Sequence, residues 1–94
     1  MKMLKVENLV VDGKNMTAES NGKTYGIRGF YITGNGNYTL NNVTIKNVTY
    51  TLNTGTFDEA TLKVSNSTLE GWTSYGATTT ATFDNVAFTK GAYY

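Results

Sequence analysis

Apolar and polar residues alternate in five short stretches of the chain, and each stretch is centred on an asparagine or a glycine. Apolar side chains stand four and two residues before this central residue, and one and three residues after it, with Ser67 as the plainly polar exception. Alternation with a period of two is typical of β-strands. The central residues are Asn8, Gly29, Asn42, Asn66 and Asn85. The pattern predicts five strand segments of one common design.

The parity of the alternation changes at each central residue, because the positions two before and one after it both face inward. A straight strand cannot do this, so the chain must bend or bulge there. Such a bend needs a residue with positive φ, which glycine adopts freely and asparagine tolerates best among the others. We therefore predict a bend at all five positions. We also predict a ladder of hydrogen-bonded asparagine side chains that point into the interior, as in other stacked β-structures.

The central residues are 21, 13, 24 and 19 residues apart, as their numbers give directly. Intervals of roughly 20 to 25 residues predict the coils of a solenoid, in which each repeat stacks on the next. The interval of 13 is too short for a coil with three faces. Two interpretations stay open: residues 25–34 lie on another face of a longer first coil, or that coil is irregular.

A two-strand repeat of this period around a central asparagine resembles the right-handed parallel β-helix of the pectate-lyase-like superfamily, over roughly Leu4 to Gly91. The resemblance implies an all-β fold, a single-stranded parallel β-helix of about four coils with an Asn/Gly bend ladder. Residues 1–94 would form one such domain or a fragment of a longer one. The family's fold carries lyases, hydrolases, adhesins and phage tail spikes, so the resemblance implies architecture more than activity.

The composition limits the partners, catalytic groups and metal ligands that this chain can have. The net charge is +1, and the chain has no Cys, no His and no Pro. Near neutrality argues against nucleic acid as a partner, and the missing residues remove thiolates and the commonest base and metal ligand. No apolar run approaches the roughly 20 residues of a membrane span. We predict no catalytic residue, no metal and no cofactor. Residues 1–8 show no secretory signal, so the location stays unknown, and a cell-surface or virion location would require a longer parent chain.

Two acids and one lysine share the column four residues after the central residue, namely Asp12, Lys46 and Glu70. We interpret them as a charge ladder on the surface. The alternative is an acid pair tuned by the lysine, as glycoside hydrolysis requires. Polysaccharide lyases of the family use clustered acids with calcium and a basic residue. This chain has a single arginine and, apart from Asp58-Glu59, no acid cluster.

Exposed aromatic rings suit the apolar C–H faces of sugars, and one loop offers them. Trp72 and Tyr75 stand between Gly71 and Gly76, and they are candidates for a glycan-binding platform. Two tyrosines from other stretches, Tyr31 and Tyr50, are candidates to complete it. The alternative, which we favour, is that Trp72 folds back over the edge of the core, since large amphipathic side chains often do so.

Threonine pairs and Asn-x-Ser/Thr triplets recur in the chain, and we interpret both as structural. The Thr-x-Thr pairs do not fall in one column of the repeat, as an ice-binding surface would require. The triplets match glycosylation acceptors, but those at Asn42 and Asn66 coincide with the predicted inward-pointing ladder. The Asn-x-Ser/Thr triplets begin at Asn15, Asn37, Asn42, Asn47 and Asn66.

These observations favour a non-catalytic β-solenoid module of a bacterial or phage surface protein. It would act as a scaffold, an adhesin or a carbohydrate binder. The alternative is the remnant of a polysaccharide lyase or glycoside hydrolase. No capping element is evident at either end of the repeat. We therefore predict that the bare solenoid ends are covered by self-association, by another partner or by the rest of a longer parent chain.

Overall fold

A computed structural model describes residues 2–55 and 59–90, and all regular structure within them is β-strand. The long strands β1, β5, β7 and β9 form a parallel sheet in that order, β4, β6 and β8 form a second parallel sheet, and β2 pairs with β3 as an antiparallel hairpin. The strands are β1 (Lys2–Asp12), β2 (Thr17–Ser20), β3 (Lys23–Gly26), β4 (Arg28–Ile32), β5 (Gly36–Lys46), β6 (Tyr50–Thr54), β7 (Ala60–Glu70), β8 (Trp72–Ser74) and β9 (Thr79–Thr89).

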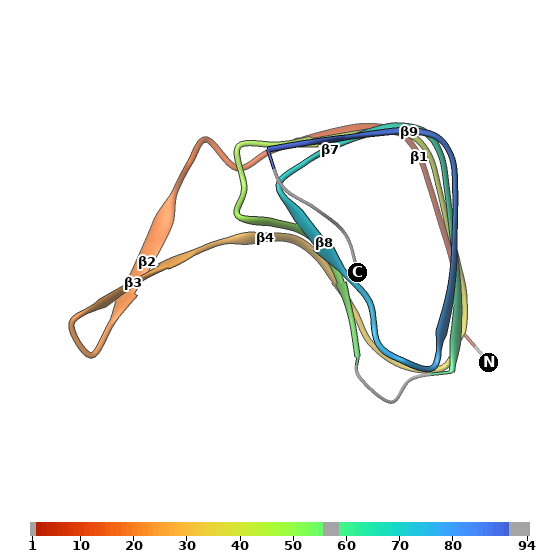
Figure 1. Cartoon of the computed structure of the whole chain (residues 1–94), viewed down its shortest axis with the longest axis horizontal. Coiled ribbons are helices and arrows are strands. Elements are labelled where there is room, and N and C mark those ends of the chain that lie inside the picture. The colour runs from red at the N-terminus through yellow and green to blue at the C-terminus, as the bar shows by residue number, and fades with distance from the viewer. Residues whose placement is uncertain (1, 56–58, 91–94) are drawn as a thin grey trace.

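Each of the four long strands bends sharply at its asparagine. The φ angles are 57° at Asn8, 56° at Asn42, 50° at Asn66 and 55° at Asn85. These residues also drop out of the register of strand pairing, which resumes on the far side of the bend. The predicted bends at these four positions are confirmed. Figure 1 shows the four strands lying over one another with the same angular outline.

The core lies between the two parallel sheets. Its largest fully buried side chains come from β5 and β7, which have neighbours on both sides, and from β6 and β8. The predicted inward columns of β5 and β7 are all buried, including Ser67. The same columns in the outer strands β1 and β9 are only half-buried or exposed. The alternation of the sequence therefore gave the inward face correctly, and the position of a strand in the sheet decides how far that face is covered.

The predicted single-stranded β-helix is wrong, because the strands belong to three separate sheets and do not close into one solenoid. Two features of the chain explain the difference. The long strands pass the bend as continuous 11-residue elements of one sheet, so the two flanks of a bend are not separate strands. The segment after β1 forms the antiparallel hairpin β2–β3 instead of another strand of a parallel sheet, and Figure 1 shows this hairpin projecting away from both sheets.

Gly29 is not a bend, and this resolves the short interval of 13 residues. It lies inside β4, in the three-stranded sheet, and its φ is not in the positive range found at the asparagines. Of the first interpretation, that residues 25–34 lie on another face of a longer first coil, only the separate placement of β4 is found, because the strands form no such coil. Glycine is needed there because a Cβ atom would lie 2.7 Å from the Thr51 carbonyl oxygen and 2.8 Å from Cγ2 of Ile45.

Candidate functional site

The three-stranded sheet brings three large side chains into one row. In the parallel register, Arg28 of β4 pairs with Tyr50 of β6, and Tyr50 pairs with Trp72 of β8. Trp72 is 42% exposed, and Tyr31, three residues after Arg28 in β4, is 59% exposed. Since neighbouring parallel strands lie about 4.8 Å apart, these side chains gather within a few strand widths. We call Arg28, Tyr31, Tyr50 and Trp72 the aromatic face.

Arg28 joins the two tyrosines of the aromatic face. Its guanidinium carbon lies 5.2 Å from the centre of the Tyr31 ring and 5.7 Å from the centre of the Tyr50 ring, within the range of cation–π attraction. Among residues 2–55 and 59–90, no carboxylate forms an ion pair with Arg28. The N–H groups of the guanidinium are therefore not taken up by an acid of the described chain, while its plane is held by the rings.

Tyr75, which was also a candidate for the platform, packs elsewhere than the aromatic face. Its ring packs against Phe83 of β9, with centroids 6.2 Å apart, and Phe83 in turn meets Phe88 edge-on at 5.1 Å. Both phenylalanines are half-buried on the inward side of β9. Tyr75 thus packs against the end of the core, the role that the alternative interpretation gave to Trp72. The structure brings together Tyr31, Tyr50 and Trp72, but not Tyr75.

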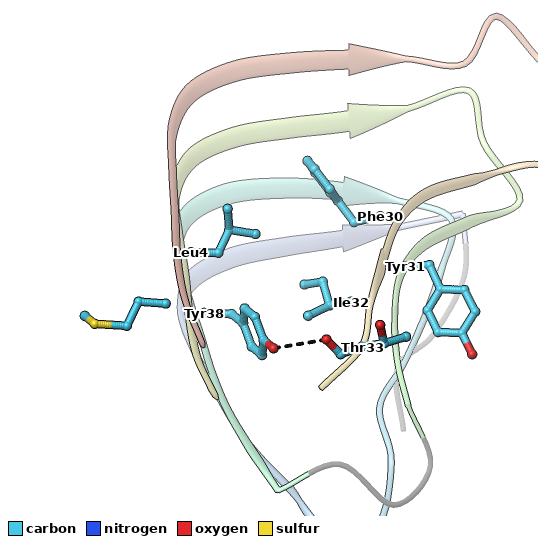
Figure 2. Close-up of a pocket in the computed structure, with 7 residues that line it drawn as sticks. Leu4, Phe30, Tyr31, Ile32, Thr33 and Tyr38 are labelled. Atoms are coloured by element: carbon cyan, nitrogen blue, oxygen red, sulfur yellow. Dashed lines mark hydrogen bonds between the residues drawn. The ribbon is translucent and has the colours of Figure 1, made fainter. Parts of the chain in front are cut away.

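An apolar pocket of about 550 Å³ opens between β1 and β4. Figure 2 shows Leu4, Ile32 and Tyr38 pointing toward the space between these strands, while the Tyr31 ring lies on the other side of β4. The Tyr38 hydroxyl donates to the carbonyl oxygen of Gly34 at 2.7 Å and approaches that of Thr33 at 3.2 Å. The lining residues are Met3, Leu4, Phe30, Tyr31, Ile32, Thr33 and Tyr38. The alternation predicted that Leu4, Ile32 and Tyr38 face inward, but it did not predict a pocket between them.

The predicted charge column is present, and Asn47 organises it. Asp12 pairs with Lys46 in the β1–β5 register. The Asn47 side chain donates to Oδ1 of Asp12 at 2.8 Å, and its backbone N–H donates to Oε2 of Glu70 at 3.0 Å. Lys90 pairs with Oε1 of Glu70 at 3.3 Å. The two acids are therefore connected through one asparagine and flanked by lysines.

These contacts lower the pKa of both acids. The hydrogen bond from the Asn47 side chain, followed by the one from the Lys14 backbone N–H, lowers the pKa of Asp12 below its ordinary value of 3.8. The backbone N–H of Asn47, followed by Lys90, lowers the pKa of Glu70 below its ordinary value of 4.5. Both carboxylates stay ionised at neutral pH. A general acid for glycoside hydrolysis needs the opposite shift.

A second column of turns escaped the sequence prediction. It stands five residues after each asparagine bend, where Asn47, Lys90 and Gly71 have φ angles of 56°, 57° and 136°. Gly13, in the same column, donates its N–H to the Lys46 carbonyl oxygen at 3.0 Å. Two glycines and an asparagine in one column are the same signal that identified the first bend, so the pattern could have revealed this corner as well.

The asparagine ladder runs along the outside of the bend, not the inside. The Nδ2 atom of Asn42 donates to Oδ1 of Asn8 at 2.7 Å, and that of Asn85 donates to Oδ1 of Asn66 at 2.9 Å. Between them, Asn66 donates to Oδ1 of Asn41 at 3.0 Å. The predicted inward orientation is wrong, because all four bend asparagines are exposed. A bend with positive φ turns both flanks inward while its own side chain points to solvent.

The described part of the chain was compared with two further kinds of site, a metal centre and a membrane-spanning helix. Within residues 2–55 and 59–90, no three acids gather closely enough to hold a metal ion. The same residues contain no helix with the length and apolar character needed to cross a bilayer. Asp58, which with Glu59 makes the acid cluster noted in the sequence, lies outside the described residues.

The chain was compared with protein-family models, curated proteins and solved structures. No protein-family model, no curated protein and no solved structure matches this chain. The predicted resemblance to the pectate-lyase-like superfamily therefore receives no support from these comparisons.

Proposed function

We propose that the chain is a non-catalytic carbohydrate-binding module, of the kind that a bacterial or phage surface protein uses to hold a glycan. The aromatic face is the site. The observation that supports this most is the convergence of Tyr31, Tyr50 and Trp72 on one exposed face of the three-stranded sheet. Aromatic rings offer a broad apolar surface with a polar edge, which matches the alternating C–H and hydroxyl faces of a sugar ring.

Arg28 gives this face a polar anchor. A guanidinium presents five N–H donors in a rigid fork, and cation–π attraction to the rings of Tyr31 and Tyr50 holds this group at the face. Sugar hydroxyl and ring oxygens accept such hydrogen bonds. Because the residues stand on paired strands, little conformational entropy is lost on binding, which favours a preformed site. The same reasoning disfavours a flexible recognition loop.

The enzyme alternative has weaker support. Asp12 and Glu70 are the acids that the sequence singled out, and the pKa of each is lowered by hydrogen bonds from Asn47. Their oxygens are engaged within the corner of the sheet, where they hold neighbouring turns together. A proton donor to a glycosidic oxygen would need a carboxyl that keeps its proton at working pH.

The carbohydrate proposal predicts that binding depends on Trp72. The intact chain is screened on an immobilised glycan array, and the best soluble oligosaccharide is then titrated by calorimetry. We expect Trp72→Ala to weaken binding by about 30-fold, the loss typical of a central aromatic contact worth about 2 kcal/mol. Tyr31→Ala is expected to act in the same direction. The matched control is Tyr25→Ala, since Tyr25 is equally exposed, at 50%, but stands on the hairpin strand β3.

Two results would count against this site. Absence of binding across the array would remove the carbohydrate function. Binding that is lost with Tyr25→Ala but kept with Trp72→Ala would move the site to the hairpin.

A second copy of the chain is the other partner that we propose. The four-stranded sheet ends in β1 on one side and β9 on the other, and neither outer strand has a second neighbour in the described chain. Outer strands with unpaired backbone groups favour pairing with another chain. Uncovered apolar side chains at these ends favour the same association, which a rise of mass with concentration in light scattering would reveal.

A further inference from the structure

The β1 end of the molecule is the least covered part of its apolar interior. Leu4 and Leu9 occupy inward columns, yet they are 43% and 41% exposed. Their partners in the next strand, Tyr38 and Val43, are buried. The pocket adjoins this edge and exposes further apolar side chains of β1 and β4. One more strand beside β1 would bury Leu4 and Leu9 to the extent that Tyr38 and Val43 are already buried in β5.

The missing cover follows from the path of the chain. After β1 ends at Asp12, the chain leaves the sheet as the hairpin β2–β3 and returns only at β4. No strand of the described chain pairs with the outer edge of β4. Both parallel sheets therefore end together on the same side of the interior, and the pocket lies between their outer strands.

We infer that the β1 edge receives the β9 edge of a second copy, so that copies associate head to tail. This rests on the self-association proposed above and adds which edges meet. β1 and β9 have the same length of 11 residues, and each bends at its seventh residue, Asn8 or Asn85. A second copy's β9 thus has the bent outline that β5 presents to β1 within one molecule.

The inward columns match across this junction. With Asn85 set beside Asn8, Ala81 falls beside Leu4 and Val86 beside Leu9. The half-buried rings of Phe83 and Phe88 fall beside Val6 and Val11. Every inward position of β1 thus meets an apolar side chain, as in the pairing of β1 with β5. Covering the apolar surface of such a column contributes favourably to association.

The asparagine ladder has a direction that fits the same junction. Within the molecule, amide groups donate toward β1, from Asn85 to Asn66 and from Asn42 to Asn8. In the described chain, this leaves Nδ2 of Asn8 as a donor at one end and Oδ1 of Asn85 as an acceptor at the other. A head-to-tail junction joins these two groups, whereas a β1-to-β1 junction would bring two donors together.

The junction also sets one like-charge pair, which makes the register testable. Setting Asn85 beside Asn8 brings Asp84 beside Glu7, and Glu7 already pairs with Lys5 at 3.2 Å. Like charges directly opposite each other on neighbouring strands are unfavourable. We expect Glu7→Lys to tighten association by about two- to fivefold, measured as the dissociation constant in sedimentation equilibrium. Unchanged or weaker association would overturn this register.

A mixing experiment tests the choice of edges. Leu4→Lys places a charge on the inward column at the β1 edge, and Ala81→Lys places one at the β9 edge. We expect each variant alone to be monomeric by light scattering across a concentration series. We expect their equimolar mixture to give a heterodimer of twice the monomer mass, through the intact β9 of the first and the intact β1 of the second. The wild-type chain should instead form larger species, because a head-to-tail contact need not close.

The controls keep every outcome informative. Val10→Lys adds the same charge to an exposed position of β1 that faces away from the interior, and it should leave association intact. Leu9→Lys with Val86→Lys provides a second pair, should either first variant lose its β-sheet circular dichroism. An Ala81→Lys variant that still dimerises alone would overturn the head-to-tail arrangement while keeping self-association through β1. A wild-type chain that is monomeric at all concentrations would overturn both.

Discussion

Asn42 combines two tasks in one exposed side chain. Its backbone adopts a φ of 56°, which lets the strand bend, and its amide donates to Asn8 of the neighbouring strand at 2.7 Å. The first task could be done by glycine and the second by several polar residues. Only asparagine does both well, since its short amide tolerates the left-handed region. The recurrence of asparagine at the four bends follows from this.

Substitution at Asn42 separates the two tasks. Asn42→Gly keeps the bend and loses the amide hydrogen bond, and we expect the free energy of unfolding to fall by about 1 kcal/mol. Asn42→Ala loses the bond and also strains the backbone, which costs about 1 kcal/mol more. Urea unfolding of both variants measures the difference. Equal losses would show that the positive φ carries no cost here.

Ser67 shows why a polar residue stands in an apolar column. It follows the bend of β7 and is buried. Its hydroxyl accepts the N–H of Val43 at 3.0 Å and donates to the carbonyl oxygen of Ser65 at 2.8 Å. The N–H of Val43 follows the bend of β5, where the regular pairing of β5 with β7 is interrupted. Ser67 thus satisfies a buried backbone group that an apolar residue would leave unpaired.

At the scale of elements, β4 depends on a close approach to its neighbours. Gly29 sits where a Cβ atom would lie 2.7 Å from the backbone oxygen of Thr51 in β6. Backbone cannot yield as a flexible side chain can, so the methyl group of alanine would push β4 away from β6. This strand carries Arg28 and Tyr31, and the spacing between β4 and β6 therefore sets the geometry of the aromatic face.

We expect Gly29→Ala to lower the free energy of unfolding by about 1–3 kcal/mol, as overpacking of a core typically does. It should also weaken glycan binding, although Gly29 itself faces away from the site. Chemical denaturation and calorimetry with the same oligosaccharide measure the two effects. Gly22→Ala is a comparison on the hairpin, where nothing lies within 4 Å of the added Cβ atom although φ is +75°. Retained stability in Gly29→Ala would contradict the close-approach account.

The sequence predicted much within the elements and less between them. Alternation identified the inward side chains of β5 and β7, and the asparagines identified four bends, because both signals are local. The same alternation occurs around Gly29. The neighbouring residues alone do not show whether a glycine provides a positive φ for a bend or the space for a close backbone contact. Which parallel sheet a strand joins depends on partners 19 or more residues away, as Ala60 and Thr79 show. The aromatic face was predicted in three of its residues, whereas Arg28 and the pocket required the register.

At the scale of the whole molecule, the two parallel sheets are linked by corners, and one corner is charged. This corner joins residues at the ends of the four long strands, namely Asp12, Asn47, Glu70 and Lys90. The pKa of each acid is lower in the folded protein than its ordinary value. A lowered pKa means that the stabilisation is present above the ordinary value and is lost as the pH falls through the folded value.

Stability should therefore fall on acidification below the ordinary pKa values of 3.8 and 4.5. We expect the urea midpoint to be nearly constant above about pH 5 and to decline toward about pH 3. The double variant Asp12→Asn, Glu70→Gln should start lower and decline less. Parallel declines in the two proteins would show that these carboxylates do not contribute to the acid sensitivity.

The hairpin β2–β3 has a consequence for how the chain tolerates change. All eight of its strand residues are exposed, while its base is fastened by backbone hydrogen bonds from Asn15 to Asn47 and from Thr49 to Ile27. We expect the arm to tolerate changes of length and composition toward its tip, but not at Gly26, where a Cβ atom would clash with the Thr49 side chain. The tip of the hairpin is therefore a suitable place to insert a peptide. A foreign peptide grafted at this tip would be displayed on an arm that projects away from both sheets (Figure 1).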